Sequence, residues 1–433
     1  MLQNLTLILL IGAIYLGYFR NSEKKYIFNN FDPSLKQFPL IYEENFFDSK
    51  SLEKLDKIVK STGEAKPIED PDCRHPYMVS KNNNTFCAFP SRIDIGEHYL
   101  KTGGFENHME KYETMTARVM TFRHKFLDEH SENSLKEIYG DKFLFKAREI
   151  CHKNDPNNYK LNNLIISLFQ FDVILMLPGQ ELPMHLDIPY FWGADRKNIP
   201  HWLLSLMKQS SLFDEHFIPQ VQGVSWLSRH QYKKLEIESA KNGGNFYFYP
   251  YVEEKEKFVL AKSEYNSALL VDGTQVVHGV ERFKSEFEQP PLEKNKKYYL
   301  SYEANEDSWG LYDQNDKKIK EYKNDDLRVS LVWRVHCFKD MDEKVKYDNQ
   351  KNDDRLSVET VLDIFKNDMK ARNKNLDENM SNLEFLIKLI EEYSVYSNKI
   401  QNGLPVFNYC LIPLVMPKIL NDYFFNYLFY FIC

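Results

Sequence analysis

Three side chains have the types and the order of a metal site. His185 and Asp187 stand in the segment PGQELPMHLDIPYFWG, and His278 stands much later in ALLVDGTQVVHGVERF. Two imidazoles and one carboxylate form the facial ligand set of mononuclear non-haem iron sites and leave positions open for a co-substrate and O2. The spacing alone is weak evidence in a chain with 12 His and 63 acidic residues, because such a pattern can arise by chance. The surrounding segments are therefore needed to judge whether these residues form a metal site.

Strand-like segments surround these residues. Residues 171–177 are apolar with β-branched members and end at a Pro-Gly turn signal. On extended backbone, His185 and Asp187 would present their side chains on one face, as a shared metal requires. Residues 268–274 predict a strand and a turn, and residues 276–280 predict the next strand, which carries the second histidine near its start.

A third segment supplies a candidate carboxylate clamp. Residues 326–335 have an apolar strand pattern in which Arg328, Ser330 and Arg334 lie at even spacing and therefore on one face. An arginine with a serine two residues later can hold a carboxylate, because the guanidinium binds as a two-pronged fork and the hydroxyl adds a donor.

In this order, the motifs resemble the Fe(II)/2-oxoglutarate-dependent dioxygenases, in a prolyl-hydroxylase-like arrangement without an identified subfamily. That family binds the far carboxylate of 2-oxoglutarate with an Arg-x-Ser after its second histidine. HGVE at His278, GGNFYFYP at residues 243–250 and LRVSLVW look like its core strands. The resemblance spans residues 161–340 and implies a mainly β fold with flanking α: a double-stranded β-helix (jelly-roll) core with peripheral helices and hydrophobic termini.

The resemblance also implies roles for the site residues. His185, Asp187 and His278 would hold Fe(II), and Arg328 and Ser330 would hold the far carboxylate of 2-oxoglutarate, with no catalytic residue beyond the metal ligands. O2 would be the oxidant, and ascorbate is a further candidate cofactor. Such enzymes release succinate and CO2 while they oxidise a substrate C–H bond, and the protein orients the reactants and excludes water.

One feature departs from the family pattern. Arg328 follows His278 by 50 positions, where many members have about one short hairpin. An extra hairpin at residues 297–302 and 309–312, followed by a charged segment, would fill the gap, and a surface insertion costs little stability. Arg334 is the alternative clamp.

An aromatic loop follows the first two ligands. Tyr190, Phe191 and Trp192 are candidates for the substrate pocket, with core packing as the alternative. Residues 200–207 start like a helix with proline in its first turn. Arg196 is either a partner for an anionic substrate or a solvated surface side chain.

The chain exceeds one ordinary domain, since a jelly-roll needs less than half of its 433 residues. A helix at residues 47–61 would begin at Asp48 or Ser49, and periodicity predicts further helices at 114–132, 134–152, 357–370 and 381–393. We divide the chain into residues 1–20 as a membrane anchor or signal segment, 40–160 as a mostly helical N-terminal region, 161–345 as the jelly-roll dioxygenase core, 346–402 as a charged helical C-terminal region, and 403–433 as a hydrophobic tail.

Composition bears on partners and location. The net charge of −7, with both signs mixed along the chain, argues against nucleic acid as a partner. Residues 1–19 carry no charged side chain and fit a signal anchor better than a cleaved signal peptide. They predict a membrane-anchored protein of the endoplasmic reticulum or secretory pathway, with open topology. Cys73 and Cys87 would form a disulfide if the body is lumenal.

Three classes of function follow. The preferred class is an oxygenase that hydroxylates an unknown substrate, a protein side chain such as proline or lysine before a small molecule. The first alternative is a jelly-roll metalloenzyme that does not use 2-oxoglutarate, and the Arg328-x-Ser330 clamp argues against it. The second is a non-catalytic, membrane-tethered binding module whose three metal-type residues are coincidental.

Overall fold

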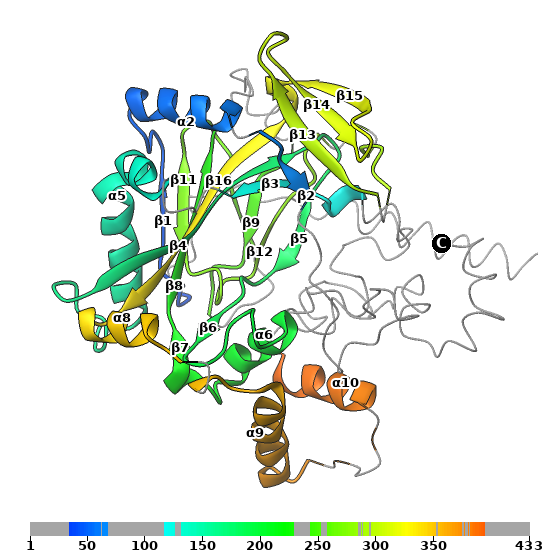
Figure 1. The fold of residues 1–433 in the computed structure, drawn as a ribbon. Helices are drawn as coiled ribbons and strands as arrows, with labels where there is room; N and C mark the ends of the chain where they lie inside the picture. Colours follow the sequence, from blue (N-terminus) through cyan, green and yellow to red (C-terminus); the bar gives the residue numbers. More distant parts are fainter. Residues whose placement is uncertain are drawn as a thin grey trace, which may run out of the picture.

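A large antiparallel sheet forms the centre of the fold in the computed structural model (Figure 1). Its seven strands lie in the order β1 (Leu40–Glu43), β11 (Ala268–Val271), β8 (Gln220–Trp226), β16 (Arg328–Phe338), β4 (Ile165–Met176), β3 (Phe122–Lys125) and β2 (Lys66–Pro67). The structure describes residues 34–61, 63–67, 117–125, 131–228, 243–252, 258–284, 287, 289–293, 296–351, 354–374, 376, 380 and 382–394.

A second antiparallel sheet completes a barrel. Its strands lie in the order β10 (Val259–Ala261), β9 (Phe246–Phe248), β12 (His278–Val280) and β5 (Leu182–His185). Along the chain, β4, β8, β11 and β16 join the large sheet, whereas β5, β9, β10 and β12 join the small one. Eight strands that are shared between two sheets in this order make a jelly-roll. The predicted fold class, mainly β with flanking helices around a double-stranded β-helix, is therefore confirmed.

The two faces of β16 differ in chemistry because side chains alternate along a strand. Leu331, Trp333 and Val335 belong to the apolar cluster on the outer face of the large sheet. Arg328 and Ser330 lie on the opposite face, which lines the barrel interior beside an apolar cluster from both sheets. The alternation that the sequence shows is thus the alternation of the folded strand.

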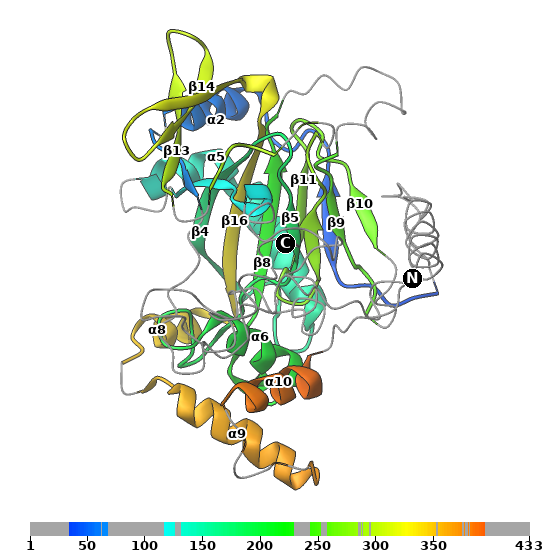
Figure 2. The same ribbon diagram turned by 90° about the vertical axis from the view of Figure 1, so that its right-hand side faces the viewer.

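Two helices cover the outer face of the large sheet (Figures 1 and 2). Helix α2 (Ser49–Ser61) is capped by Asp48, whose Oδ1 accepts a hydrogen bond of 2.8 Å from the Ser51 backbone N–H. Helix α5 (Ser131–Asn154) contributes Phe143, whose ring centroid lies 4.9 Å from that of Trp333. The predicted helices at 47–61 and 134–152 are confirmed.

The predicted helix at residues 114–132 is wrong at its centre, because residues 117–119 and 131–132 are helical but a strand lies between them. Residues 122–125 form β3, which pairs with β4 from Phe122 opposite Leu175 to Lys125 opposite Asp172. The Phe122 side chain is fully buried in the outer cluster. Pairing with an edge of the sheet therefore overrides the local helical pattern.

A disulfide joins the helical layer to the sheet. Cys151 of α5 and Cys337 of β16 are bonded, with their Cα atoms 6.4 Å apart, and both are buried. Nothing in their sequence spacing predicted this pair. Cys73 and Cys87, the pair that the sequence suggested, lie outside the described residues.

The stretch between β12 and β16 forms a sheet of its own. Strands β13 (Tyr298–Glu303) and β14 (Ser308–Asp313) are the predicted hairpin, and β15 (Lys318–Lys323) adds a third strand that the charged sequence did not suggest. Leu300 and Leu311 are buried in the outer cluster, so this sheet is anchored at the rim of the barrel. The insertion lengthens the connection and packs on the outer cluster, whereas the apolar cluster between the two sheets contains none of its described residues.

A helical lobe lies at the opposite end of the barrel (Figures 1 and 2). Helices α6 (His201–Ser210), α9 (Val358–Ala371) and α10 (Asn382–Tyr393) share a separate apolar cluster, and α8 (Met341–Asp348) follows β16 directly. Ser357 caps α9 by accepting a hydrogen bond from the Thr360 backbone N–H. The predicted helices at 200–207, 357–370 and 381–393 are confirmed.

The prediction of a membrane-spanning helix is wrong for the described part of the chain, where no helix is long and apolar enough to cross a bilayer. The proposed anchor at residues 1–20 and the hydrophobic tail at 403–433 lie outside the described residues. We therefore do not propose a membrane-anchored or transmembrane protein.

Trp333 offers a test of the outer core. Its side chain is fully buried between the rings of Phe46, Phe143 and Phe171, and a Cβ added to Gly223 on β8 would lie only 2.0 Å from its indole nitrogen. Trp333→Ala should lower the free energy of unfolding by about 3–5 kcal/mol through lost burial and a cavity, as measured by denaturant titration.

The control for this experiment is another aromatic residue in the same layer. Phe145 on α5 is 63% exposed, so Phe145→Ala should change the free energy of unfolding by no more than about 0.5 kcal/mol. Equal losses in the two variants would contradict the role assigned to Trp333.

Candidate metal centre

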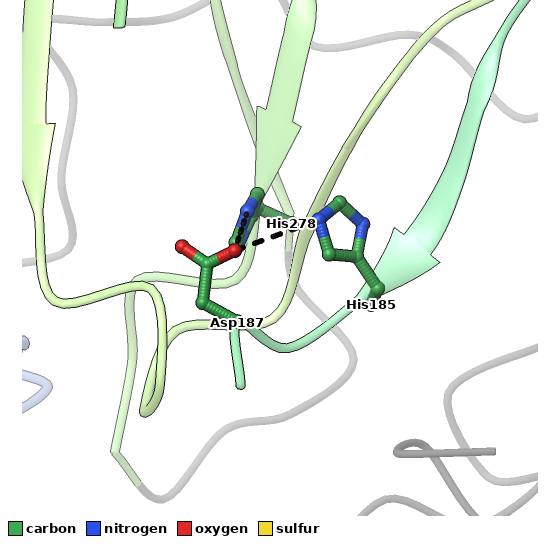
Figure 3. Close-up of side chains that lie close together, drawn as sticks. All are labelled: His185, Asp187 and His278. Carbon is green, nitrogen blue, oxygen red and sulfur yellow. Dashed lines mark ion pairs between the residues drawn. The ribbon is translucent and has the colours of Figure 1, made fainter. Parts of the chain in front are cut away.

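His185, Asp187 and His278 converge inside the barrel (Figure 3). His185 ends β5 and His278 begins β12, and the two residues are direct partners in the antiparallel pairing of these strands. Asp187 Oδ1 lies 4.0 Å from His185 Nε2 and 3.9 Å from His278 Nε2. The three side chains, which are only 1–3% exposed, present one ligand atom each to a common point.

The backbone orients both imidazoles. Nδ1 of His185 lies 2.8 Å from the Pro183 carbonyl oxygen, and Nδ1 of His278 lies 2.8 Å from the Val276 carbonyl oxygen. Because a carbonyl oxygen only accepts, each Nδ1 carries the proton in the neutral ring and each Nε2 keeps its lone pair for the shared point. This tautomer is the one that a metal ligand needs.

Asp187 is held in place by the turn that precedes β12. Its backbone N–H donates to the Gly273 carbonyl oxygen over 2.7 Å. A Cβ at Gly273 would lie 2.1 Å from Asp187 Oδ2, so the carboxylate can approach this turn only because residue 273 is glycine. Oδ2 is buried without a hydrogen-bond partner, which costs free energy. The donor set of two imidazole nitrogens and one carboxylate oxygen, which lie close together in a buried place, fits a divalent cation.

Arg334 lies beside Asp187, the carboxylate of the triad that His185, Asp187 and His278 form. It forms an ion pair with Asp187 Oδ1, and its Nε donates to Gln222 Oε1 over 2.7 Å. The Gln222 amide nitrogen is also 3.3 Å from His278 Nε2. The residue predicted as the alternative clamp is therefore next to the metal-type ligands, and Gln222 links it to His278.

Arg328 lies six residues earlier on the same face of β16 and is 3% exposed. Its guanidinium donates to the Gly244 carbonyl oxygen over 2.7 Å and lies 3.4 Å from Ser330 Oγ and 3.3 Å from Ser263 Oγ. The structure thus brings Arg328 and Ser330 together and adds Ser263, which sequence reasoning missed because it lies on a separate segment after β10. A guanidinium with two hydroxyls suits a carboxylate.

The three aromatic residues of the loop have different surroundings. Phe191 is buried in the helical lobe against Phe213 and Phe217. The Trp192 ring packs on Tyr347 of α8 with centroids 5.7 Å apart. Tyr190 alone of the three contacts the interior face of the large sheet, where its ring meets those of Phe169 and His336.

The helical lobe supports this loop. The Leu356 backbone N–H donates to the Gly193 carbonyl oxygen over 2.8 Å, and the Asn198 amide donates to the carbonyl oxygens of both residues. Arg355 forms an ion pair with Asp195 at 3.3 Å. Residues that follow β16 thus fix the loop that leaves the metal-type ligands.

His336 is a buried histidine two residues beyond Arg334 on β16. Its ring stacks on Phe169 with centroids 3.9 Å apart, and Nε2 has no hydrogen-bond partner. Burial, with a smaller contribution from Lys344, lowers the pKa of His336 to about 3. The ring is therefore neutral at physiological pH. Nothing in the sequence distinguished this residue, because only its aromatic neighbours reveal its environment.

Among the described residues, a second acidic group has geometry for a cation. Glu303, Glu306 and Glu321 lie close together at the edge of the inserted sheet. The Lys318 ammonium lies 2.5 Å, 3.1 Å and 3.1 Å from their respective carboxylates. These mostly exposed carboxylates thus already have a cation, and we assign no metal site to them.

No protein-family model and no curated protein sequence matches this chain. Solved structures do. The chain is similar to a 2OG-Fe(II) oxygenase-family oxidoreductase from Burkholderia pseudomallei, with 11% identity over 69% of this chain and 84% of that chain and a TM-score of 0.31. It is also similar to a prolyl-4-hydroxylase from Pseudomonas putida, with 7% identity over 69% and 91% of the chains and a TM-score of 0.31.

A third similar structure is the collagen prolyl hydroxylase of Paramecium Bursaria Chlorella virus-1 in complex with 2OG, with 9% identity over 69% and 94% of the chains and a TM-score of 0.28. These three proteins belong to the superfamily that the sequence motifs resemble. At such TM-scores the likeness adds no argument about the site, which rests on the side chains described above.

The buried histidine gives a prediction for stability against pH. The pKa of His336 in the folded chain lies near 3, below the value of about 6.5 in an unfolded chain. Between these values the unfolded chain binds a proton that the folded chain does not, so the contribution of neutral His336 is complete above pH ~6.5 and is lost as pH falls toward 3. The free energy of unfolding should fall more steeply in the wild type than in His336→Phe between pH 7 and 4.

Urea titrations of both proteins at each pH would measure this difference, which should reach a few kcal/mol at the acid end. Phenylalanine suits the aromatic surroundings of His336, so the variant should fold. Parallel pH profiles for the two proteins would contradict the buried, neutral state of His336.

Proposed function

We propose that the protein is an Fe(II)- and 2-oxoglutarate-dependent oxygenase that hydroxylates its substrate. The observation that supports this most is that the barrel interior holds both predicted sites. The two histidines and the aspartate converge there. The buried pair Arg328 and Ser330 lies on the same face of β16 as Arg334, which contacts the aspartate. When bound, Fe(II) and 2-oxoglutarate would supply oxidation of a C–H bond by O2, with release of succinate and CO2.

The chain itself would hold the metal in a fixed geometry. His185 and His278 offer Nε2 because backbone carbonyls bind their Nδ1 protons, and Asp187 offers a carboxylate oxygen. Two imidazoles and one carboxylate leave half of an octahedral coordination sphere for other ligands. Such an open set suits catalysis better than a structural metal.

The chain would also orient the co-substrate. Arg328 and Ser330 are rigid parts of a central strand, and Ser263 adds a hydroxyl from another segment. A carboxylate bound there would direct the other end of the molecule along the β16 face toward Asp187 and Arg334. This two-point arrangement supports 2-oxoglutarate as the co-substrate over a metalloenzyme that lacks it.

Burial would protect the reaction from water. The three candidate ligands are nearly inaccessible to solvent, and apolar side chains such as Val224, Phe246 and Val332 line the interior beside them. Exclusion of water strengthens electrostatic contacts and limits side reactions.

A protein side chain, such as a prolyl or lysyl residue, remains our first proposal for the substrate, ahead of a small molecule, and it rests on analogy. The endoplasmic reticulum or secretory pathway remains our proposal for the compartment. The disulfide between Cys151 and Cys337 supports it, because such bonds persist in oxidising compartments.

The first test is metal binding and co-substrate turnover. Purified wild-type protein should bind one Fe(II) and convert 2-oxoglutarate to succinate in the presence of ascorbate, even if slowly without substrate. His185→Ala should lower succinate formation at least 100-fold, because one of three ligands is lost. Metal content by elemental analysis and succinate by mass spectrometry measure the two properties.

His216→Ala serves as the matched control, since this histidine is exposed and lies outside the triad. It should keep wild-type metal content and turnover. Absence of bound iron in the reconstituted wild type, or equal turnover in wild type and His185→Ala, would refute the proposed function.

The second test concerns the clamp. Arg328→Gln should raise the KM for 2-oxoglutarate at least tenfold, because it removes the charged fork from a buried site, whereas metal affinity should stay near that of the wild type. Steady-state succinate formation at varied 2-oxoglutarate gives KM, and a Co(II) titration gives metal affinity.

Arg282→Gln is the control, because Arg282 binds the backbone oxygens of Gly179 and Phe287 instead of the Ser330 region. Its KM should match the wild type. An unchanged KM in Arg328→Gln together with a raised KM in Arg334→Gln would assign the clamp to Arg334 instead.

A further inference from the structure

Arg196 stands in the loop between the metal-type ligands and α6 and is partly buried. Its Nε donates to Tyr190 Oη over 3.3 Å, and one Nη donates to Gln170 Oε1 over 3.4 Å. The guanidinium carbon also lies 5.9 Å from the centroid of the Tyr190 ring. Aromatic and amide contacts therefore hold this cation in place.

The charge of Arg196 has no acidic partner among the residues that the structure describes. Its contacts are the neutral phenol and amide named above. Two other cations differ from it, because Arg355 is paired with Asp195, the residue before Arg196, and Lys208 is paired with Asp214. A partly buried guanidinium held by neutral groups is a favourable place for an anion from outside the chain.

Arg196 is also connected to the candidate metal centre. Gln170 Oε1, which accepts from Arg196, accepts from Arg334 Nη1 over 3.4 Å as well. Arg334 in turn is paired with Asp187. Arg196 and Arg334 therefore donate to the same amide oxygen. An anion bound to Arg196 would thus lie close to the candidate metal centre.

A second observation marks the same area as incomplete. His336 and Gln220 are direct partners across β16 and β8, and both are buried. His336 Nε2 and Gln220 Oε1 have no hydrogen-bond partner in the structure. Tyr190, which binds Arg196, lies with its ring centroid 4.7 Å from that of His336. Buried polar atoms without partners are costly, and a bound polar ligand would satisfy them.

We propose that the oxidised substrate carries an oxyanion, a carboxylate or a phosphate, which Arg196 binds while Tyr190 flanks it and His336 and Gln220 meet its polar groups. This inference rests on the proposed function and names the chemical class of its substrate. The co-substrate does not need Arg196, because Arg328 and Ser330 supply a separate carboxylate clamp further along β16. Both a small organic acid and an acidic peptide fit this chemistry.

Binding of anionic probes tests the proposal without turnover. Protein loaded with Mn(II) and the unreactive 2-oxoglutarate analogue N-oxalylglycine is titrated calorimetrically with inorganic phosphate, phenylacetate and a hexaglutamate peptide. Phenylacetamide and hexaglutamine are the neutral counterparts. The wild type should bind at least one anionic probe and neither neutral one, and Arg196→Gln should weaken that binding at least tenfold, about 1.4 kcal/mol.

Lys197→Gln is the matched control, because Lys197 is the adjacent cation and is exposed. It should bind the probes as the wild type does, and Arg196→Lys, which keeps the charge, should bind better than Arg196→Gln. Preference for the peptide or for the small acids identifies the source of the anion. Equal affinity in wild type and Arg196→Gln, or no anion-dependent binding by the wild type, overturns the proposal.

The outcome is separable from that of the proposed function. Normal Mn(II) binding and substrate-free succinate formation, together with probe binding that is insensitive to Arg196, would overturn this inference alone. Failure to bind metal would overturn the proposed function, whereas titration of the metal-free protein with the same probes would still report whether Arg196 binds an anion.

Discussion

The site depends on the strict alternation of side chains along β16. Trp333 points into the outer core, and Arg334, one residue later, contacts the carboxylate of the triad. A shift of one residue in the pairing of β16 would exchange these faces and place guanidinium groups in the aromatic core. Antiparallel neighbours on both sides, β8 and β4, hold the strand in register. Packing of the outer face thus positions the polar groups on the inner face.

Much of the fold was predictable because its signals are local. Asp48 and Ser357 cap their helices as the sequence indicates, and the strands around the triad follow apolar runs that end at turns. Features that depend on distant partners were not predictable. Residues 122–125 become a strand because the free edge of β4 pairs with them, and Cys151 and Cys337 meet only after α5 packs on the sheet.

The candidate site shows the same division. Each member of the triad lies on or beside a strand, so its order and spacing were visible in the sequence. The residues that connect the site were not, because Gln170, Gln222 and Ser263 carry no motif and reach it from separate segments. The sequence analysis grouped Tyr190 with Phe191 as pocket candidates. Adjacent residues of a short strand face opposite sides, so only one of the two can face the core. Phe191 is that residue, because the helical lobe packs against its side.

Arg328 and Arg196 differ in burial, and this difference suits them to different anions. Arg328 is almost fully buried among hydroxyls and a backbone carbonyl, so an anion bound there must be enclosed with it and gains strength from the low dielectric. Arg196 is only partly buried, and its loop is braced from outside by residues that follow β16. An enclosed cation suits an anion of one fixed shape, such as a common co-substrate. A cation on a braced loop suits the anion of a larger molecule, whose remainder can extend beyond the barrel.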